Sequence, residues 1–187
     1  QRANDPSRAV ASLIANHASF DVIEALGQSM TALACPFAPD IIVGIPTLGL
    51  ALAPLIAKQL GHRHFAPLGY SRKYWYQDNM SEPVRSITSP DAAKRVFIDP
   101  NLLPRVSGKR VLVVDDTISS GTTALAVLRL LERIGAETVA LVFAMNQGGR
   151  WRKKLDPEWH EKLHTVFFSP MLRAVPEGWM PEPEEGD

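Results

Sequence analysis

The stretch VLVVDDTISSGTT, residues 111–123, decides the fold class of this chain. Its first four residues are apolar, which is typical of a strand buried on both faces in the middle of a parallel sheet. Two carboxylates, Asp115 and Asp116, follow where we expect that strand to end, and a turn rich in hydroxyl groups comes next. Apolar residues then recur at spacings of three and four from Ala124 to Ile134, which predicts a helix packed on a sheet and stopped by Gly135. The stretch therefore predicts an α/β fold.

The turn also carries groups that bind phosphate and sugar hydroxyls. A helix N-terminus presents unpaired N–H groups to an anion, Gly121 allows the backbone to approach closely, and serine and threonine hydroxyls add donors. Asp115 and Asp116 can accept hydrogen bonds from vicinal sugar hydroxyls, or hold Mg²⁺ directly or through water. Helix capping alone is the alternative, but it uses one or two such residues, whereas five hydroxyl groups surround this glycine. Since the chain contains no GxxxxGK[ST], a Walker loop is excluded and a sugar-phosphate site is expected.

With the alanine that follows it, the stretch VLVVDDTISSGTTA resembles the phosphoribosyl-pyrophosphate (PRPP) motif of the type I phosphoribosyltransferases, among which the adenine and xanthine enzymes are nearest. The resemblance implies a doubly wound, Rossmann-like parallel sheet with a small variable hood. It implies that Asp115 and Asp116 are catalytic, hold the ribose 2- and 3-hydroxyls and bind Mg²⁺, the expected cofactor. The implied binding residues for the ribose and its 5-phosphate are Asp115, Asp116, Thr117, Ser119, Ser120, Gly121, Thr122 and Thr123.

Length and composition limit the remaining possibilities. The 187 residues are enough for one well-buried domain, and we assign residues 1–187 to a single phosphoribosyltransferase domain with its core at about 38–147. The 20 basic and 20 acidic side chains balance, so overall charge favours neither nucleic acid nor a membrane surface as a partner. A single cysteine, Cys35, cannot form an intramolecular disulfide, which favours a reducing compartment such as the cytoplasm.

A second strand, turn and helix is predicted earlier in the chain. We expect a buried strand from Asp40 to Ile45 and a helix running toward Leu60. The 17 uncharged residues 41–57 are at the short limit for a membrane span, but glycine and proline interrupt them, so buried elements are the better interpretation. In the family, the matching turn binds the pyrophosphate of PRPP largely through backbone N–H groups; here it is Pro46, Thr47, Leu48 and Gly49. Many members place a basic residue where this chain has Leu48, and an ordinary βα turn is the alternative.

A long polar and aromatic loop, SRKYWYQDNMSEP, follows a short strand predicted at His64 to Leu68. Long loops in compact domains are usually lids or binding loops. In the family, a flexible loop at this position carries basic residues that close over the pyrophosphate, and Arg72 and Lys73 match them as catalytic, pyrophosphate-binding residues. Adjacent cations could neutralise the leaving group and exclude water. The alternative is a solvated basic pair whose neighbouring aromatic residues pack on another subunit.

The rest of the chain carries weaker signals. Residues 1–39 are expected to be helical, with Ser19 or Asp21 as a cap. Strands are expected at Arg85 to Thr88, Arg95 to Asp99 and Thr138 to Met145. The hood that binds the nucleobase in the family is expected from residues 1–37, 148–187 or both.

A competing motif is His160-Glu161-Lys162-Leu163-His164, which matches HExxH. In zinc hydrolases the two histidines share one face of a helix and the glutamate acts as a base. Here the match lies beside Pro157 in a short charged segment, so zinc chemistry is the remote alternative.

The resemblance implies transfer of the 5-phosphoribosyl group from PRPP to a nucleobase nitrogen, a purine by preference, with release of pyrophosphate. PRPP and a nucleobase are the expected partners, and a homodimer is the family's usual assembly. A PRPP-binding regulator without turnover is the alternative, although the basic loop argues for catalysis.

Overall fold

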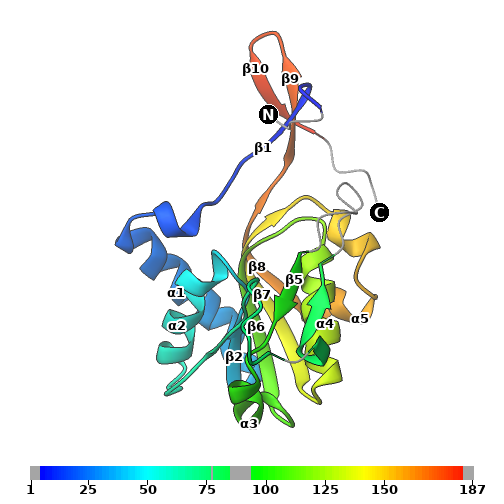
Figure 1. The fold of residues 1–187 in the computed structure, drawn as a ribbon. Coiled ribbons are helices and arrows are strands. Elements are labelled where there is room, and N and C mark those ends of the chain that lie inside the picture. The colour runs from blue at the N-terminus through cyan, green and yellow to red at the C-terminus, as the bar shows by residue number, and fades with distance from the viewer. Residues whose placement is uncertain (1–4, 77, 85–93, 183–187) are drawn as a thin grey trace.

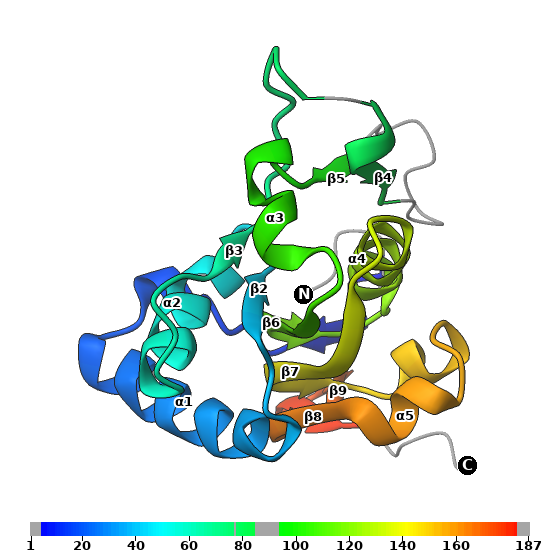
Figure 2. The same ribbon diagram turned by 90° about the horizontal axis from the view of Figure 1, so that it is seen from below.

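The structure is a computed structural model that describes residues 5–76, 78–84 and 94–182, except for the side chain of Asp78. Its centre is a five-stranded sheet in which every neighbouring pair is parallel. In spatial order, the strands are β3 (Ala66–Pro67), β2 (Ile41–Gly44), β6 (Arg110–Ile118), β7 (Glu137–Gln147) and β8 (Leu163–Ser169). The strand predicted from Val111 is thus central. Figure 2 shows the strands with helices on both sides.

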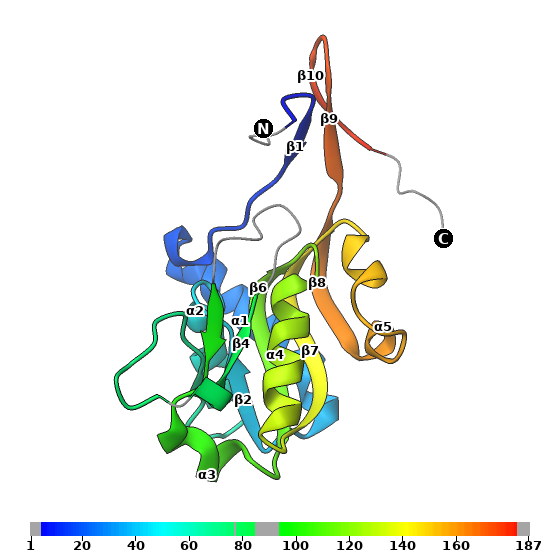
Figure 3. The same ribbon diagram turned by 45° about the vertical axis from the view of Figure 1, so that its right-hand side comes forward.

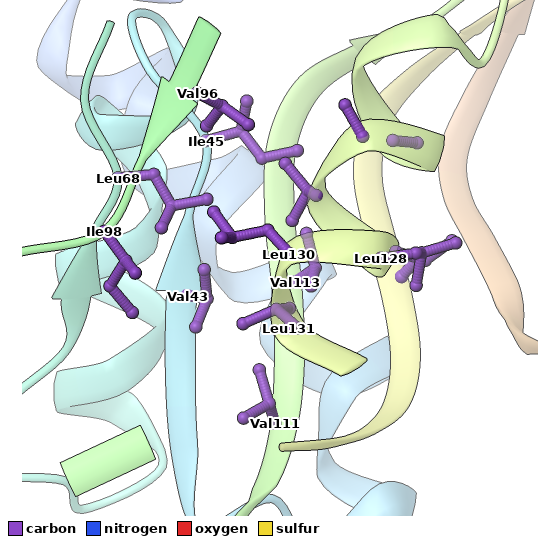
Figure 4. Packing of buried hydrophobic residues seen from close by; sticks show 14 of the residues in the cluster. Val43, Ile45, Leu68, Val96, Ile98, Val111, Val113, Leu128, Leu130 and Leu131 are labelled. Carbon is purple, nitrogen blue, oxygen red and sulfur yellow. The ribbon is translucent and has the colours of Figure 1, made fainter. Parts of the chain in front are cut away.

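Two apolar layers cover the two faces of this sheet, because successive side chains of a buried strand point to opposite faces. Leu112 and Val114 pack with α1 (Phe20–Ala34) and α2 (Gly49–Gln59). Val111 and Val113 pack on the other face, below α4 (Thr122–Arg133), as Figure 4 shows. The predicted doubly wound α/β class is confirmed.

Shorter elements complete the chain. The remaining α-helices are α3 (Leu103–Val106) and α5 (Glu158–Lys162), and five 3₁₀ turns are described, η1 (Ala15–His17), η2 (Cys35–Phe37), η3 (Asp78–Met80), η4 (Pro100–Leu102) and η5 (Arg150–Lys153). The expected cap of α1 is correct, since the Ser19 hydroxyl accepts a hydrogen bond from the Val22 N–H at 3.4 Å.

Both ends of the described chain join in a second sheet. Strand β9 (Met171–Val175) pairs in antiparallel fashion with β1 (Arg8–Val10) on one side and with β10 (Gly178–Pro181) on the other. This small sheet stands beyond the carboxyl ends of the parallel strands (Figures 1 and 3). The expectation of helix throughout residues 1–39 is therefore wrong for Arg8–Val10, because pairing with a distant strand decides the backbone conformation there.

Strand β6 is longer than the sequence pattern indicated. It continues through both aspartates to Ile118, because Asp115, Thr117 and Ile118 remain paired with β7. The expected end of the strand before Asp115 is thus wrong. The consequence is that Asp115 and Asp116 lie on rigid sheet backbone rather than on a loop.

A β-hairpin covers part of the α4 face of the sheet. Strand β4 (Ser81–Pro83) pairs with β5 (Arg95–Phe97), which confirms the start of the strand predicted at Arg95 to Asp99. The other predicted arm, Arg85 to Thr88, lies outside the described residues. Arg133 of α4 holds the hairpin by an ion pair with the Glu82 carboxylate and a hydrogen bond of 2.9 Å to the Ser81 carbonyl.

The predicted stop of α4 at Gly135 is confirmed. Gly135 has a φ of +74°, its N–H donates to the Glu132 carbonyl, and the Ala136 N–H donates to the Leu131 carbonyl, both at 2.9 Å. This is the Schellman arrangement that ends helices on a left-handed residue.

We expect Gly135→Ala to lower the free energy of unfolding by about 1 kcal/mol, because an L-side chain is strained at positive φ. The added Cβ would meet no atom within 4 Å, so backbone conformation alone would cause the loss. Gly149→Ala is the control, since Gly149 is equally open but has a φ of −94°. Urea denaturation of both variants measures the difference; equal stabilities would contradict the explanation.

None of the helices within the described ranges is long and apolar enough to cross a membrane. Residues 41–57 instead form β2, the turn and most of α2, as the sequence predicted.

Candidate functional site

Two buried carboxylates form the centre of the candidate site. Asp115 and Asp116 are only 9% and 8% exposed. The Asp115 Oδ1 accepts a hydrogen bond of 2.9 Å from the Asp116 N–H, and the Thr117 hydroxyl donates to Asp116 Oδ2 at 3.2 Å. Burial raises the pKa of Asp115 well above its ordinary value, and the neighbouring charge of Asp116 raises it further. Within the described residues, no basic side chain forms an ion pair with either carboxylate.

The turn between β2 and α2 lies directly against this pair. The Gly49 N–H donates a hydrogen bond to the Asp115 carboxylate, and the Ile45 N–H donates to the Val114 carbonyl at 2.9 Å. A Cβ at Gly49 would stand 2.8 Å from Asp115 Cα, Asp115 Oδ1 and the Val114 carbonyl oxygen. Only glycine fits such a close approach. The predicted turn Pro46 to Gly49 is thus joined to the predicted ribose site by direct contact.

The predicted phosphate turn follows β6 at the carboxyl edge of the sheet. Gly121 caps α4 with a φ of +75°, which suits the left-handed conformation expected of a glycine in a tight turn. The Ser120 hydroxyl donates to Thr122 Oγ1 at 3.0 Å and accepts from the Thr122 N–H at 3.4 Å. Ser119 and Thr123 are half-buried beside it. Together with Thr117, these side chains bring the predicted hydroxyl donors to one end of one strand.

Tyr70 is a residue of this site that the sequence interpretation missed. Burial raises the pKa of Tyr70 to about 12, the charge of Asp115 adds to the rise, and a hydrogen bond with the Thr123 side chain opposes it. The Tyr70 hydroxyl therefore stays protonated at neutral pH, bonds the Thr123 side chain and lies close enough to Asp115 to feel its charge. The Lys94 ammonium stands over its ring at 3.7 Å from the centroid. Its position in the sequence could have indicated this residue, because Tyr70 follows β3 and so lies at the same sheet edge as Asp115.

Replacing Tyr70 by phenylalanine should weaken binding of ribose 5-phosphate about fivefold and leave the fold intact, because one neutral hydrogen bond to Thr123 is lost. Tyr76→Phe is the control, because it removes the same hydroxyl from a tyrosine that bonds Asp99 instead. This variant should bind ribose 5-phosphate as wild type does. Calorimetric titration compares the two variants. Equal affinities would place Tyr70 outside the site.

Arg72 and Lys73 are exposed in the segment between β3 and η3. Figures 2 and 3 show this segment extending away from the parallel sheet. The two cations follow Tyr70 by two and three positions, so the loop that carries them starts beside the aspartates. Tyr74, at 96% exposed, projects from the same segment, and the Trp75 Nε1–H donates to Asp99 at 3.2 Å. The structure thus places Arg72 and Lys73 at the start of an outward loop rather than among the buried site residues.

The HExxH interpretation is wrong, because α5 ends at Lys162 and His164 belongs to strand β8. The two histidines therefore do not share a helix face. His160 Nε2 lies 3.0 Å from the Arg152 carbonyl, while His164 packs against the Phe37 ring. Nor does the described chain contain any group of three or more His, Cys, Asp or Glu side chains that could hold a metal ion.

Sequence comparison adds evidence on the chain as a whole. The family model described as the phosphoribosyl transferase domain matches residues 9–170. The xanthine phosphoribosyltransferase of Chloroflexus aurantiacus is 31% identical over 131 residues, which are 68% of this chain and 58% of that protein. The adenine phosphoribosyltransferase of Thermotoga petrophila is 31% identical over 104 residues, 56% of this chain and 57% of that protein. The chain thus spans less than two thirds of the length of these relatives.

Solved structures share the fold. The structure of adenine phosphoribosyltransferase from Rhodothermus marinus aligns with 87% of this chain and with 94% of its own chain. The TM-score is 0.67 at 22% sequence identity. A Leishmania tarentolae adenine phosphoribosyltransferase covers 80% of this chain, and 72% of its own length is matched, with a TM-score of 0.60 at 21% identity. These likenesses support the architecture of the parallel sheet and its helices.

Proposed function

Since the chain belongs to the phosphoribosyl transferase domain family, we propose that it transfers the 5-phosphoribosyl group of PRPP to a nitrogen of a purine base and releases pyrophosphate. One observation supports this most directly. The buried pair Asp115 and Asp116 lies in contact with the turn that ends at Gly49 and a few residues before the turn 119–123. A carboxylate pair between two anion-binding turns matches a ligand with two hydroxyls between a phosphate and a pyrophosphate.

Each part of the site has a role in this reaction. Asp115 and Asp116 orient the ribose through its hydroxyls, and the turn 119–123 holds the 5-phosphate on the N-terminus of α4. Departure of pyrophosphate develops positive charge on the sugar, so catalysis depends on neutralising the leaving group. Arg72 and Lys73, carried by the outward loop, would serve there when the loop closes.

The donors present fit Mg²⁺, which prefers one or two carboxylates together with substrate phosphates. Asp115 and Asp116 form such a pair, and among the described residues their charge is not offset by a basic side chain. Bound as a complex with PRPP, the ion would supply positive charge at the pyrophosphate.

The names of the relatives favour a purine as the acceptor. We assign the hood to the small sheet of β1, β9 and β10, because it stands beyond the carboxyl edge where the ribose would lie (Figure 1). We also expect a homodimer in the cytoplasm, which sedimentation and cell fractionation would check.

The decisive experiment is calorimetric titration of PRPP with Mg²⁺, followed by pyrophosphate release against a panel of purine and pyrimidine bases. Binding with release for a purine is the expected result. Binding without release for any base would favour a PRPP-binding regulator. Absence of binding would overturn the assignment of the site, and titration with EDTA in place of Mg²⁺ is the control.

A further inference from the structure

Positive charge is missing from the turn that we assign to the 5-phosphate. Residues 117–123 contain no lysine or arginine, and two carboxylates precede them. A phosphate dianion placed beside Asp115 and Asp116 is repelled by them, and backbone N–H groups supply only partial charges. Beyond the Mg²⁺ proposed for the two aspartates, a cation from elsewhere in the chain would offset this repulsion at the 5-phosphate itself.

The structure supplies such a cation from the segment after β7. The Arg150 Nη2 donates a hydrogen bond of 2.8 Å to the Ser119 hydroxyl oxygen. We propose that Arg150 binds the 5-phosphate together with the turn 119–123, an assignment that rests on the proposed function and extends it to a residue outside the family motif.

The hydrogen bond to Ser119 has a directional consequence. A serine hydroxyl has one proton, and when its oxygen accepts from Arg150 that proton points to another acceptor. In the proposed complex, a phosphate oxygen would be that acceptor. The guanidinium is a planar, charged fork whose shape matches phosphate, and one of its N–H groups bonds Ser119.

Packing of the next residue fixes the backbone that carries Arg150. Its neighbour Trp151 is 2% exposed, and the Trp151 Nε1–H donates to Asn146 Oδ1 at 3.0 Å. A Cβ at Gly121 would stand 3.2 Å from Trp151 Cβ and 3.3 Å from Lys154 Cβ. The segment from Arg150 to Lys154 therefore forms one wall of the turn 119–123, which holds the Arg150 backbone beside Ser119 while the side chain stays exposed to ligand.

The test compares two probes, ribose 5-phosphate and inorganic pyrophosphate, by calorimetric titration of the intact protein. Arg150→Gln should bind ribose 5-phosphate about tenfold more weakly, because a charge-assisted contact is lost, and pyrophosphate within twofold of wild type. Arg150→Lys should recover part of the affinity. The affinity of Arg150→Gln should also depend less on salt, since one cation no longer contributes.

Arg152→Gln is the matched control. It removes the same charge from the same turn, but the Arg152 guanidinium lies over the Trp151 ring at 4.7 Å from the centroid. Its affinity for both probes should stay within twofold of wild type.

Each other outcome is informative. If Arg150→Gln weakens binding of both probes equally, Arg150 supports the fold and does not bind the 5-phosphate. If Arg150→Gln binds both probes as tightly as wild type, and wild type binds ribose 5-phosphate, the inference about Arg150 is wrong and the proposed function stands. If wild type binds neither probe, the proposed function fails and Arg150 with it.

Discussion

Asp115→Asn is expected to raise the free energy of unfolding at pH 7 by about 1–2 kcal/mol while lowering PRPP-dependent turnover about a hundredfold or more. The two effects have one cause. Asp115 is a buried carboxylate beside Asp116, so the folded protein without substrate disfavours its negative charge. In the proposed reaction, the same charge would hold the ribose hydroxyls.

The pH dependence gives the sign of the stability effect. The pKa of Asp115 is higher in the folded protein than its unfolded value of about 4, so folding favours the protonated form. The stability that protonated Asp115 contributes to the wild type is fully present below the unfolded pKa and is lost as the pH rises through the folded pKa. The stability gained by Asp115→Asn should therefore be largest at neutral and alkaline pH and disappear in acid.

Urea denaturation at several pH values, paired with a pyrophosphate-release assay, measures both effects. Asp156→Asn changes an exposed carboxylate and should leave stability within about 0.5 kcal/mol at every pH. A variant of Asp115 that is inactive and less stable at neutral pH would show that the carboxylate supports the fold. Asp116→Asn should likewise lose most turnover while remaining folded, and normal turnover in it would refute the ribose assignment.

The second large effect is expected for Gly49→Ala. Its new Cβ would stand 2.8 Å from the Val114 carbonyl oxygen and from Asp115, and real Cβ atoms do not approach backbone so closely. Because β6 is the central strand, the turn 46–49 must move instead, which breaks the hydrogen bond from the Gly49 N–H to Asp115. We expect a loss of about 3 kcal/mol of stability and of at least tenfold in pyrophosphate affinity.

Gly27→Ala provides the comparison. Gly27 is also buried, but its Cβ would meet Leu55 at an ordinary 3.4 Å, and alanine is a better helix former within α1. Thermal unfolding should rank Gly27→Ala at or above wild type and Gly49→Ala well below it. If Gly49→Ala keeps both stability and pyrophosphate affinity, the turn does not depend on its contact with Asp115.

The sequence predicted the parts of the fold that local pattern determines. The apolar run from Val111 and the helix stripe ending at Gly135 specify β6 and α4, because burial and helix termination act over a few residues. The start of β2 and the helix after it followed from the same kind of pattern. The end of β6 did not, since pairing with β7 carries the strand through two aspartates whose intrinsic preference is for loops.

Contacts between distant segments were the part that pattern could not supply. β1 has three residues and depends on β9 for its conformation, so no periodicity marks it. Strand β8 was not predicted, because the HExxH match includes its first two residues, Leu163 and His164. Tyr70 and Arg150 enter the site through Thr123 and Ser119, contacts that only the folded chain reveals.

The small sheet also bears on how the chain is made. Val10 lies opposite Met171, so β1 leaves the ribosome long before its partner strand has been synthesised. The segments that form α1, α2, α4 and the first four parallel strands all precede β9 in the chain. They can assemble while β1 still lacks its partner strand. The carboxyl edge with its aspartates therefore forms before the small sheet is complete, and a ligand that binds this edge would stabilise the nascent domain.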